Sequence, residues 1–331
     1  MRFSEYMNQW LYGEKGYYSK YRIIGKQGDF YTAVSSSQFF GGTIGKYIVD
    51  SIENNKFSNN LTVCEIGAHK GYLIADIIQF IYTLKPKLLN SLKFVIIERY
   101  ENLIKIQKKY LQDSFGDEVQ IEFFSSLKDF KSDETFYIAN EIFDAFPTEL
   151  YYKGKTATVN LENHKIEFNL EDPKVTEIAN KMGIDKGEVP LNYADFGEEL
   201  KNSSKKFEFM TFDYGDNFAR SDFSMRIYSR HEVHPLFDEN IKIADYYKNS
   251  DITYDVNFKY LAEEFAKIGI TNSYFATQSK ALVEMGIIEL LEMLRKNVNK
   301  KTYESELNRM KILIDPAFMG ERFKMIKFSN L

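Results

Sequence analysis

The sequence predicts an α/β fold built on a mostly parallel sheet. From residue 61 onward, short apolar runs alternate with longer stretches in which apolar residues recur at the spacing of one helix face. That alternation is typical of βα units, whose parallel strands are joined by helices. The chain has 331 residues, of which 44% are hydrophobic and 27% charged. It can therefore supply the core of one elaborated domain or of two smaller ones.

The first half of this sheet is predicted over residues 61–149. Four short apolar runs are expected as its strands: 61–66, 92–97, 119–124 and 135–139. Two stretches with helical periodicity, 71–84 and 101–111, are expected between them. Pro86 stands where the first of these helices should end. Four strands in this order make one half of a doubly wound sheet.

An inserted subdomain is predicted over residues 150–205. Its first part, 150–170, has the alternation of a hairpin with a turn at Lys153, Gly154 and Lys155, and a helical and irregular stretch, 171–204, follows. This block is the candidate lid or substrate subdomain. The second half of the sheet is expected over 206–331, with the following elements: a strand at 207–212, a helix at 258–268, an apolar run around 274–275 and a last strand at 323–328.

Composition excludes several classes of function. The formal net charge is −5 and no dense run of Lys and Arg occurs, which argues against nucleic acid as a partner. The four histidines show no metal-ligand spacing with carboxylates, so no metal site is expected. Cys64 is the single cysteine and no targeting or membrane-spanning segment is visible, so we expect a soluble, cytoplasmic protein without membrane insertion. The oligomeric state is left open.

A glycine turn follows the first predicted strand and is the strongest local signal of a ligand site. Glu65 lies just before the turn, Gly67 and Ala68 open it, and His69 precedes Gly71 at the start of the next helix. Such a turn lets the backbone approach a ligand closely, and the helix start offers unpaired N–H groups. A dinucleotide fingerprint would need glycines at the third and sixth positions, where His69 and Tyr72 stand. An NAD site is therefore disfavoured.

Acidic residues follow two further predicted strands at the same edge of the sheet. Glu98 ends the second strand, just before Arg99, and we expect its carboxylate to accept both hydroxyls of a ribose. The alternative is that Glu98 caps a helix or faces solvent. Asn140, Glu141 and Asp144 follow the fourth strand and could hold a guanidinium, because paired carboxylates match its fork of donors. The alternative for Asp144 is a role in forming the turn.

Taken together, these residues resemble the MidA family of S-adenosylmethionine-dependent methyltransferases. The resemblance extends over nearly the whole chain and includes the following segments: Gly28-Asp29-Phe30-Tyr31-Thr32, the glycine turn, Asn140-Glu141, Asp144-Ala145, Asp213-Tyr214-Gly215, Asp251-Ile252-Thr253 and Met319-Gly320-Glu321-Arg322. It implies a class I methyltransferase fold, Rossmann-like, with a seven-stranded sheet. It also implies that Gly28, Phe30 and Thr32 bind the cofactor from an N-terminal segment, residues 1–60, folded over the cofactor cleft, and that Asp29 is a further candidate catalytic residue.

The resemblance implies transfer of a methyl group from S-adenosylmethionine, with S-adenosylhomocysteine as product. A mitochondrial member of the family is a complex I assembly factor that methylates arginine in a partner subunit. We therefore expect an arginine methyltransferase acting on a protein, with a respiratory-complex subunit as a candidate partner. Two alternatives remain open: a cofactor-binding assembly chaperone with little or no turnover, and a small-molecule methyltransferase.

This chain departs from the family pattern at two positions. His69 stands where the family usually has glycine in the middle of its turn, and Ser35 stands where it usually has an acidic residue. If the turn requires a positive φ at position 69, the histidine costs on the order of 1 kcal/mol or more. We interpret His69 as a tolerated substitution; the other interpretations are a new ligand contact and a lesion that weakens cofactor binding.

Overall fold

The computed structural model describes residues 1–20, 32–230 and 232–331. Gly28, Asp29 and Phe30 therefore lie outside the described residues. The chain forms two compact units, which are described separately below. The sheet unit comprises Tyr31–Asn140, Glu198–Phe212 and Ile270–Leu331. The insert unit comprises Met1–Phe30, Glu141–Gly197 and Asp213–Gly269.

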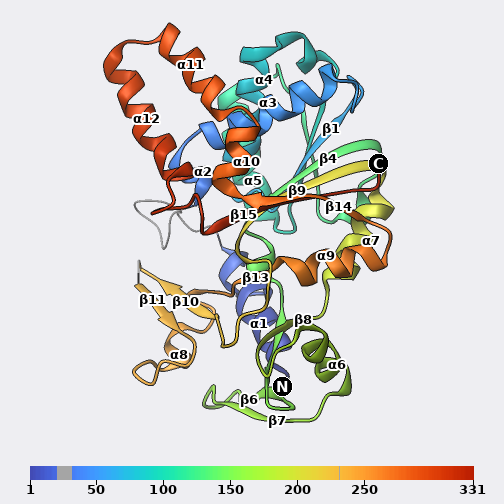
Figure 1. Cartoon of the computed structure of the whole chain (residues 1–331), viewed down its shortest axis with the longest axis vertical. Coiled ribbons are helices and arrows are strands. Elements are labelled where there is room, and N and C mark those ends of the chain that lie inside the picture. Colours follow the sequence, from blue (N-terminus) through green and yellow to red (C-terminus); the bar gives the residue numbers. More distant parts are fainter. Residues whose placement is uncertain (21–31, 231) are drawn as a thin grey trace. The chain divides into compact units, whose positions relative to one another are not determined.

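A path of seven neighbouring strands forms the main sheet, as predicted (Figure 1). In spatial order the strands are β14 (Thr271–Thr277), β15 (Phe323–Ser329), β9 (Ser204–Asp216), β4 (Ser132–Asn140), β1 (Thr62–Ile66), β2 (Lys93–Ile97) and β3 (Ile121–Phe124). The pairs β3–β2, β2–β1, β1–β4 and β4–β9 are parallel, whereas β14 runs antiparallel to β15. An eighth strand, β13 (Val256–Asn257), pairs with the end of β9 and was not predicted.

The position of β1 in this order decides where a ligand can bind. The chain builds outward from β1 through β2 to β3, and then returns to the other side of β1 with β4. That reversal makes a topological switch point between β1 and β4, and open α/β sheets bind ligands outside the carboxyl ends of the strands there. The register places Glu65 beside Ile96 of β2 and Ile138 of β4. The glycine turn that follows β1 is therefore at the switch point.

The helices of the sheet unit share one apolar core with the strands. They are α2 (Ala33–Ser36), α3 (Phe39–Glu53), α4 (Tyr72–Leu84), α5 (Glu101–Phe115), α10 (Gln278–Glu284), α11 (Ile287–Asn297) and α12 (Lys300–Ile314), with short 3₁₀ turns at Pro86–Asn90 and Leu127–Asp129. Figure 1 shows α11 and α12 as a helical hairpin. Helix α4 matches the predicted helix and ends before Pro86.

A glycine lets α3 approach α4 very closely. A Cβ atom added at Gly41 would lie 2.6 Å from Cβ of Asp76 and 3.1 Å from the carbonyl oxygen of Leu73, both on α4. No side chain fits at that distance without displacing backbone. The packing of α3 against α4 therefore depends on the absence of a side chain at position 41, and α4 is the helix that begins at the glycine turn.

The insert unit contains two small antiparallel sheets of its own. One has the order β7 (Ile166–Leu170), β6 (Lys155–Val159), β5 (Thr148–Tyr152), β8 (Lys186–Pro190), and the other has the order β11 (Glu232–Pro235), β10 (Arg226–Ser229), β12 (Asp251–Thr253). Its helices are α1 (Phe3–Tyr12), α6 (Pro173–Met182), α8 (Ile243–Tyr246) and α9 (Phe258–Lys267), with 3₁₀ turns at Tyr17–Ser19 and Phe143–Ala145. Helix α7 (Tyr193–Ser203) begins in this unit and ends in the sheet unit.

The predicted hairpin is present as β5 and β6. Its turn residues Lys153 and Gly154 have φ angles of 46° and 83°, which two-residue hairpin turns of type I′ require. The following stretch, expected to be helical and irregular, contains α6, α7 and also the strand β8, which was missed. Strand β8 pairs with β5 rather than with its neighbours in sequence, so its partner could not be predicted from the adjacent residues.

The first sixty residues are divided between the units. Helix α1 packs into the apolar core of the insert unit, and its Trp10 donates a hydrogen bond to the carbonyl of Ser250 at 2.8 Å. Helices α2 and α3 belong to the sheet unit. Among the described residues, no helix is both long enough and apolar enough to cross a membrane.

Candidate functional site

The glycine turn after β1 has a run of left-handed backbone conformations. Gly67, His69 and Gly71 have φ angles of 73°, 48° and 85°. The amide of Gly67 donates to the carbonyl of Ile97 at the end of β2, and the amide of Gly71 donates to the carbonyl of Ala68. Position 69 therefore does require a positive φ, and the histidine there carries a strain of about 1 kcal/mol.

Glu65 is buried beneath this turn and fastens it to the following helix. Its Oε2 atom accepts a hydrogen bond of 3.0 Å from the backbone amide of Ile74 in α4. Burial raises the pKa of Glu65 to about 8, and the neighbouring carboxyl groups of Asp76 and Glu98 act in the same direction. Burial likewise raises the pKa of Asp76 to about 7. Glu65 thus has a structural role in the turn, and its contact with a cofactor stays a prediction.

Glu98 is buried at the end of β2, with both carboxylate oxygens directed by hydrogen bonds. Its Oε1 atom accepts from the amide of Tyr100 at 3.1 Å, and its Oε2 atom accepts from Nε2 of Gln107 at 3.2 Å. The same Nε2 atom donates to the carbonyl of His69 at 3.0 Å. Burial raises the pKa of Glu98, while these hydrogen bonds oppose the shift. The glycine turn and Glu98 are therefore linked through the side-chain amide of Gln107.

The remaining predicted residues of the sheet unit occupy different environments. Ala68 is buried in the turn, Arg99 is exposed after β2, and Asn140 is half-buried at the end of β4. Thr32 caps the first turn of α2, where its hydroxyl accepts from the amide of Ser35 and its own amide donates to the Ser35 hydroxyl. Ser35, the second departure from the family pattern, therefore completes a capping box.

In the insert unit, a buried carboxylate holds the turn that carries Asp144. The Oδ2 atom of Asp213 accepts from the backbone amides of Phe143 at 2.9 Å and Asp144 at 3.2 Å, and its Oδ1 atom accepts from the amide of Tyr214 at 2.9 Å. The carbonyl of Asp144 in turn accepts from the amide of Tyr254 at 2.9 Å. The backbone around Asp144 is thus fixed on two sides.

Ionisation of two buried carboxyl groups at this turn, those of Asp144 and Asp213, is unfavourable. Burial raises the pKa of Asp144 to about 7 and raises the pKa of Asp213 well above its usual range, and the negative charges of Asp144 and Glu141 act on Asp213 in the same direction. Among the described residues, the Oδ1 atom of Asp144 has no hydrogen-bond partner. A buried acceptor of this kind usually has a partner, so it is a candidate contact for a ligand donor.

Glu141, one of the residues predicted to hold a guanidinium, is half-buried and has a φ of 54°. A left-handed conformation at a residue other than glycine is a strain of about 1–2 kcal/mol that often marks a functional site. The chain leaves the sheet unit at Asn140 and enters the insert unit at Glu141. The strained residue therefore stands where the two units join in sequence.

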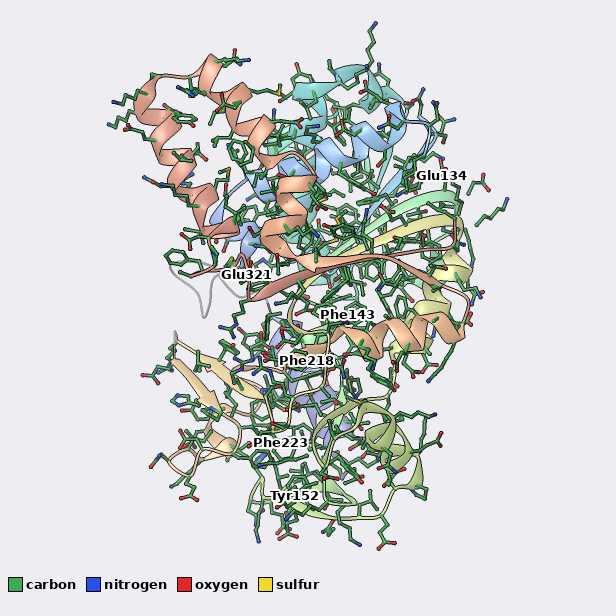
Figure 2. All side chains as sticks on the ribbon, in the orientation of Figure 1. Glu134, Phe143, Tyr152, Phe218, Phe223 and Glu321 are labelled. Atoms are coloured by element: carbon green, nitrogen blue, oxygen red, sulfur yellow. The ribbon has the colours of Figure 1, made fainter. Side chains whose placement is uncertain are left out.

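Aromatic rings surround the turn on its apolar side. The ring of Phe143, labelled in Figure 2, lies 4.9 Å from that of Phe146, 5.4 Å from that of Tyr193 and 5.6 Å from that of Phe196. Such edge-on and tilted contacts are each worth about 0.5–1.5 kcal/mol beyond burial. This cluster anchors the residue next to Asp144.

A family model described as a putative S-adenosyl-L-methionine-dependent methyltransferase matches residues 43–275 of this chain. The chain belongs to this family. The resemblance to the MidA methyltransferases is thereby confirmed, together with the class of enzyme and its methyl donor, S-adenosylmethionine. Within the described residues, no group of three or more His, Cys, Asp or Glu side chains is placed to hold a metal ion.

Curated relatives match almost the full length of this methyltransferase. The protein arginine methyltransferase NDUFAF7, mitochondrial, of Homo sapiens is 26% identical, with 97% of this chain and 78% of the relative covered. The Rattus norvegicus protein of the same name is 24% identical, with 97% and 79% covered. The prediction of a cytoplasmic location is contradicted by these relatives, whose names place them in the mitochondrion.

A solved structure supports the fold. A COG1565 superfamily member from Burkholderia thailandensis, bound to S-adenosyl-homocysteine, superposes with a TM-score of 0.82 at 22% identity and covers 99% of this chain and 87% of its own. At this level of identity the similarity bears on the fold alone, and it confirms the class I methyltransferase architecture.

The residues of the glycine turn and of β2 fit the methyl donor of the family. The carboxylate of Glu98 accepts hydrogen bonds from the amide of Tyr100, from Nε2 of Gln107 and from the backbone of Arg99. Because a carboxylate has about four acceptor positions, a ribose hydroxyl could be bound there as well. Gly67 is exposed in the turn, so the backbone there is open to a ligand. When bound, S-adenosylmethionine supplies an electrophilic methyl group.

Two residues of the site were missed from the sequence. Gln107 had a recognisable signal, because it stands between Leu103 and Leu111 on the buried face of α5, where helical spacing calls for an apolar residue. Asp213 follows the predicted strand 207–212 directly, as Glu98 follows its own strand. It was included in the family resemblance but was not assigned to the site.

Proposed function

We propose that this methyltransferase transfers the methyl group of S-adenosylmethionine to an arginine side chain of a partner protein. The observation that carries the proposal is the buried carboxyl of Asp144, whose Oδ1 atom has no hydrogen-bond partner among the described residues. A guanidinium presents N–H donors in a fixed fork and binds carboxylates strongly. The names of the curated relatives, which are protein arginine methyltransferases, support the same acceptor.

The protein's own residues would act mainly by orientation. Asp144 would accept an N–H of the guanidinium at Oδ1, and Asp213 would keep Asp144 in place through the two backbone amides that it binds. Holding one nitrogen in line with the methyl carbon lowers the barrier without a strong base. The methylated guanidinium must also release a proton, and a carboxyl with a pKa of about 7, such as that of Asp144, can take it up near neutral pH.

A contribution from Glu141 would be electrostatic. Its charge already raises the pKa of Asp213, so the three carboxyl groups form one acidic cluster in the insert unit. A cationic side chain would relieve the repulsion between them. A neutral small molecule would not, which is why we prefer an arginine-containing protein to the alternative of a small-molecule acceptor.

The proposal can be tested with labelled cofactor. The purified protein would be incubated with S-adenosylmethionine labelled on the methyl group and an extract of the source cells, and the labelled protein would be identified and its modified residue located by mass spectrometry. We propose to examine respiratory-complex subunits first, given the resemblance to the MidA family. Label on lysine, on a carboxyl group or on a small molecule would refute the arginine proposal. Cofactor binding without transfer to any component would favour an assembly chaperone.

A further inference from the structure

Gln107 is a polar residue on the buried face of helix α5. Its side chain is fully buried, in line with Leu103 and Leu111 one turn to either side. Leu111 packs under the glycine turn, since a Cβ atom added at Gly71 would lie 3.4 Å from its Cδ1 atom. An amide in such a place costs free energy unless its hydrogen bonds are made. The hydrogen-bond partners of the Gln107 amide therefore indicate the role of this residue.

The side-chain nitrogen of Gln107 donates two hydrogen bonds. Nε2 donates to the carbonyl oxygen of His69 at 3.0 Å and to Oε2 of Glu98 at 3.2 Å. The reverse orientation of the amide would place its oxygen against a carbonyl and a carboxylate, so the two acceptors fix the assignment. The Oε1 atom, by contrast, has no hydrogen-bond partner among the described residues. The side chain is thus oriented by its two donor bonds.

We infer that Gln107 is a positioning residue that sets cofactor affinity by holding the glycine turn and Glu98 in one arrangement. His69 lies in the loop between β1 and α4, and Glu98 lies after β2, so the two groups are separated in sequence and joined through this amide. The inference rests on the prediction from the sequence that Glu98 accepts the ribose hydroxyls of S-adenosylmethionine. Pre-organised groups bind more tightly because less freedom is lost on binding.

The hydrogen bond to Glu98 also favours its charged form. Burial raises the pKa of Glu98, and the bond from Gln107 opposes that shift. A carboxylate accepts hydroxyl hydrogen bonds at both oxygens, whereas a protonated carboxyl has one oxygen occupied as a donor. Gln107 therefore acts on both the position and the protonation of the group that we propose binds ribose.

Two substitutions separate this role from simple packing. Gln107→Leu keeps an apolar side chain of similar size and removes both donors. Gln107→Glu keeps the shape and removes the donors only while the new carboxyl is ionised. Gln112→Leu is the matched control, because Gln112 is an exposed residue of the same helix whose side chain donates a hydrogen bond to Asp117, away from the glycine turn.

The measurement is calorimetric titration with S-adenosylhomocysteine, with thermal unfolding of each variant recorded in parallel. We expect Gln107→Leu to weaken binding roughly tenfold or more, as for the loss of a hydrogen bond to a charged group, and Gln112→Leu to bind within about twofold of wild type. For Gln107→Glu, affinity relative to wild type should recover as the pH is lowered, because a protonated carboxyl beside Glu98 can donate one hydrogen bond.

A double-mutant cycle shows whether Gln107 acts through Glu98. In a Glu98→Ala background the Gln107→Leu substitution should cost clearly less affinity than in wild type. Equal costs in the two backgrounds, or a lowered melting temperature with unchanged affinity, would overturn the inference and leave a packing role. If Gln107→Leu does not fold, the pH profile of the isosteric Gln107→Glu decides the question.

The outcomes also distinguish this inference from the ribose assignment of Glu98, and none of these binding measurements depends on the proposed arginine acceptor. If wild type binds S-adenosylhomocysteine and Glu98→Ala binds equally well, the ribose assignment fails and the inference fails with it. If Glu98→Ala weakens binding but Gln107→Leu does not, only the inference fails. In turnover assays, Gln107→Leu should raise KM for S-adenosylmethionine with kcat largely retained, because the acceptor side of the reaction is untouched.

Discussion

The Oδ2 atom of Asp213 accepts a hydrogen bond from the backbone amide of Asp144 at 3.2 Å. One buried carboxylate thereby holds the turn that presents another. The two groups repel when both are ionised, and burial raises the pKa of each. Binding of a cation next to these carboxyl groups, or of one proton to them, is consequently favoured because it reduces this repulsion.

We predict that Asp144→Asn lowers methyl transfer about 100-fold or more while leaving cofactor affinity nearly unchanged. The substitution keeps size and removes the charge that would orient the guanidinium. Glu141→Gln should also lower transfer. Turnover would be measured on the identified protein substrate, with Asp195→Asn, an exposed carboxyl of α7 in the same unit, as the control. Wild-type turnover in both Asp144→Asn and Glu141→Gln would refute the guanidinium-holding role.

The rate of methyl transfer should fall as pH falls through about 7. The pKa of Asp144 is raised to about 7, and its ionised form is the one that accepts the guanidinium and its proton. Above that pH the carboxylate predominates and the rate should level off; below it, the protonated form predominates and the rate should drop up to tenfold per pH unit. In Asp144→Asn the residual rate should lack this step, and a step that persists there would assign the titration to another group.

We predict that Glu98→Ala weakens binding of S-adenosylhomocysteine by about 1.5–3 kcal/mol, the range for a hydrogen bond to a charged group. Calorimetry at pH 8 measures this difference. Glu101→Ala is the matched control, since Glu101 is an exposed residue in the first turn of α5, three positions along the chain. The ribose assignment would have to be abandoned if the two variants bound equally tightly.

His69→Gly should bind cofactor at least as tightly as wild type and should raise stability by up to about 1 kcal/mol. Glycine adopts the φ of 48° found at this position without steric strain. Lys153→Gly relieves a similar φ of 46° in the exposed hairpin turn and should affect stability without affecting affinity. A clear loss of affinity in His69→Gly alone would show that the imidazole contacts the ligand.

Gly41→Ala should destabilise the fold by about 1–3 kcal/mol, because the added methyl group would overlap Asp76 and the backbone of Leu73 in α4. Urea unfolding of the variant would measure the loss. Asp50→Ala on the same helix removes a solvent-facing carboxylate paired with Lys46 and should change stability by less than about 1 kcal/mol. Equal stabilities for the two variants would mean that α3 and α4 separate without cost.

Local patterns in the sequence were enough to predict most strands of the sheet unit and its helices α4 and α5, but not its other helices. Apolar runs such as 61–66 and helical periodicity such as that of 71–84 correspond to β1 and α4, because burial on both faces of a strand or on one face of a helix imposes those patterns directly. The positive φ at position 69 was expected only as a condition drawn from the family's glycine, and the structure shows that it is present. Strand β8 escaped prediction because its partner, β5, is distant in sequence.

What the sequence by itself determined is the kind of site: a parallel sheet, a glycine turn after its first strand and acidic residues after the next ones. Tertiary structure decided which side chains meet. Gln107 became a link between His69 and Glu98 because α5 packs its buried face under the turn, and Asp213 became a support for Asp144 because its Oδ2 atom reaches the amides of a segment some seventy residues away in sequence. Hydrogen bonds between distant segments leave no periodic pattern along the chain, since each depends on the register and packing of separate elements rather than on local conformation.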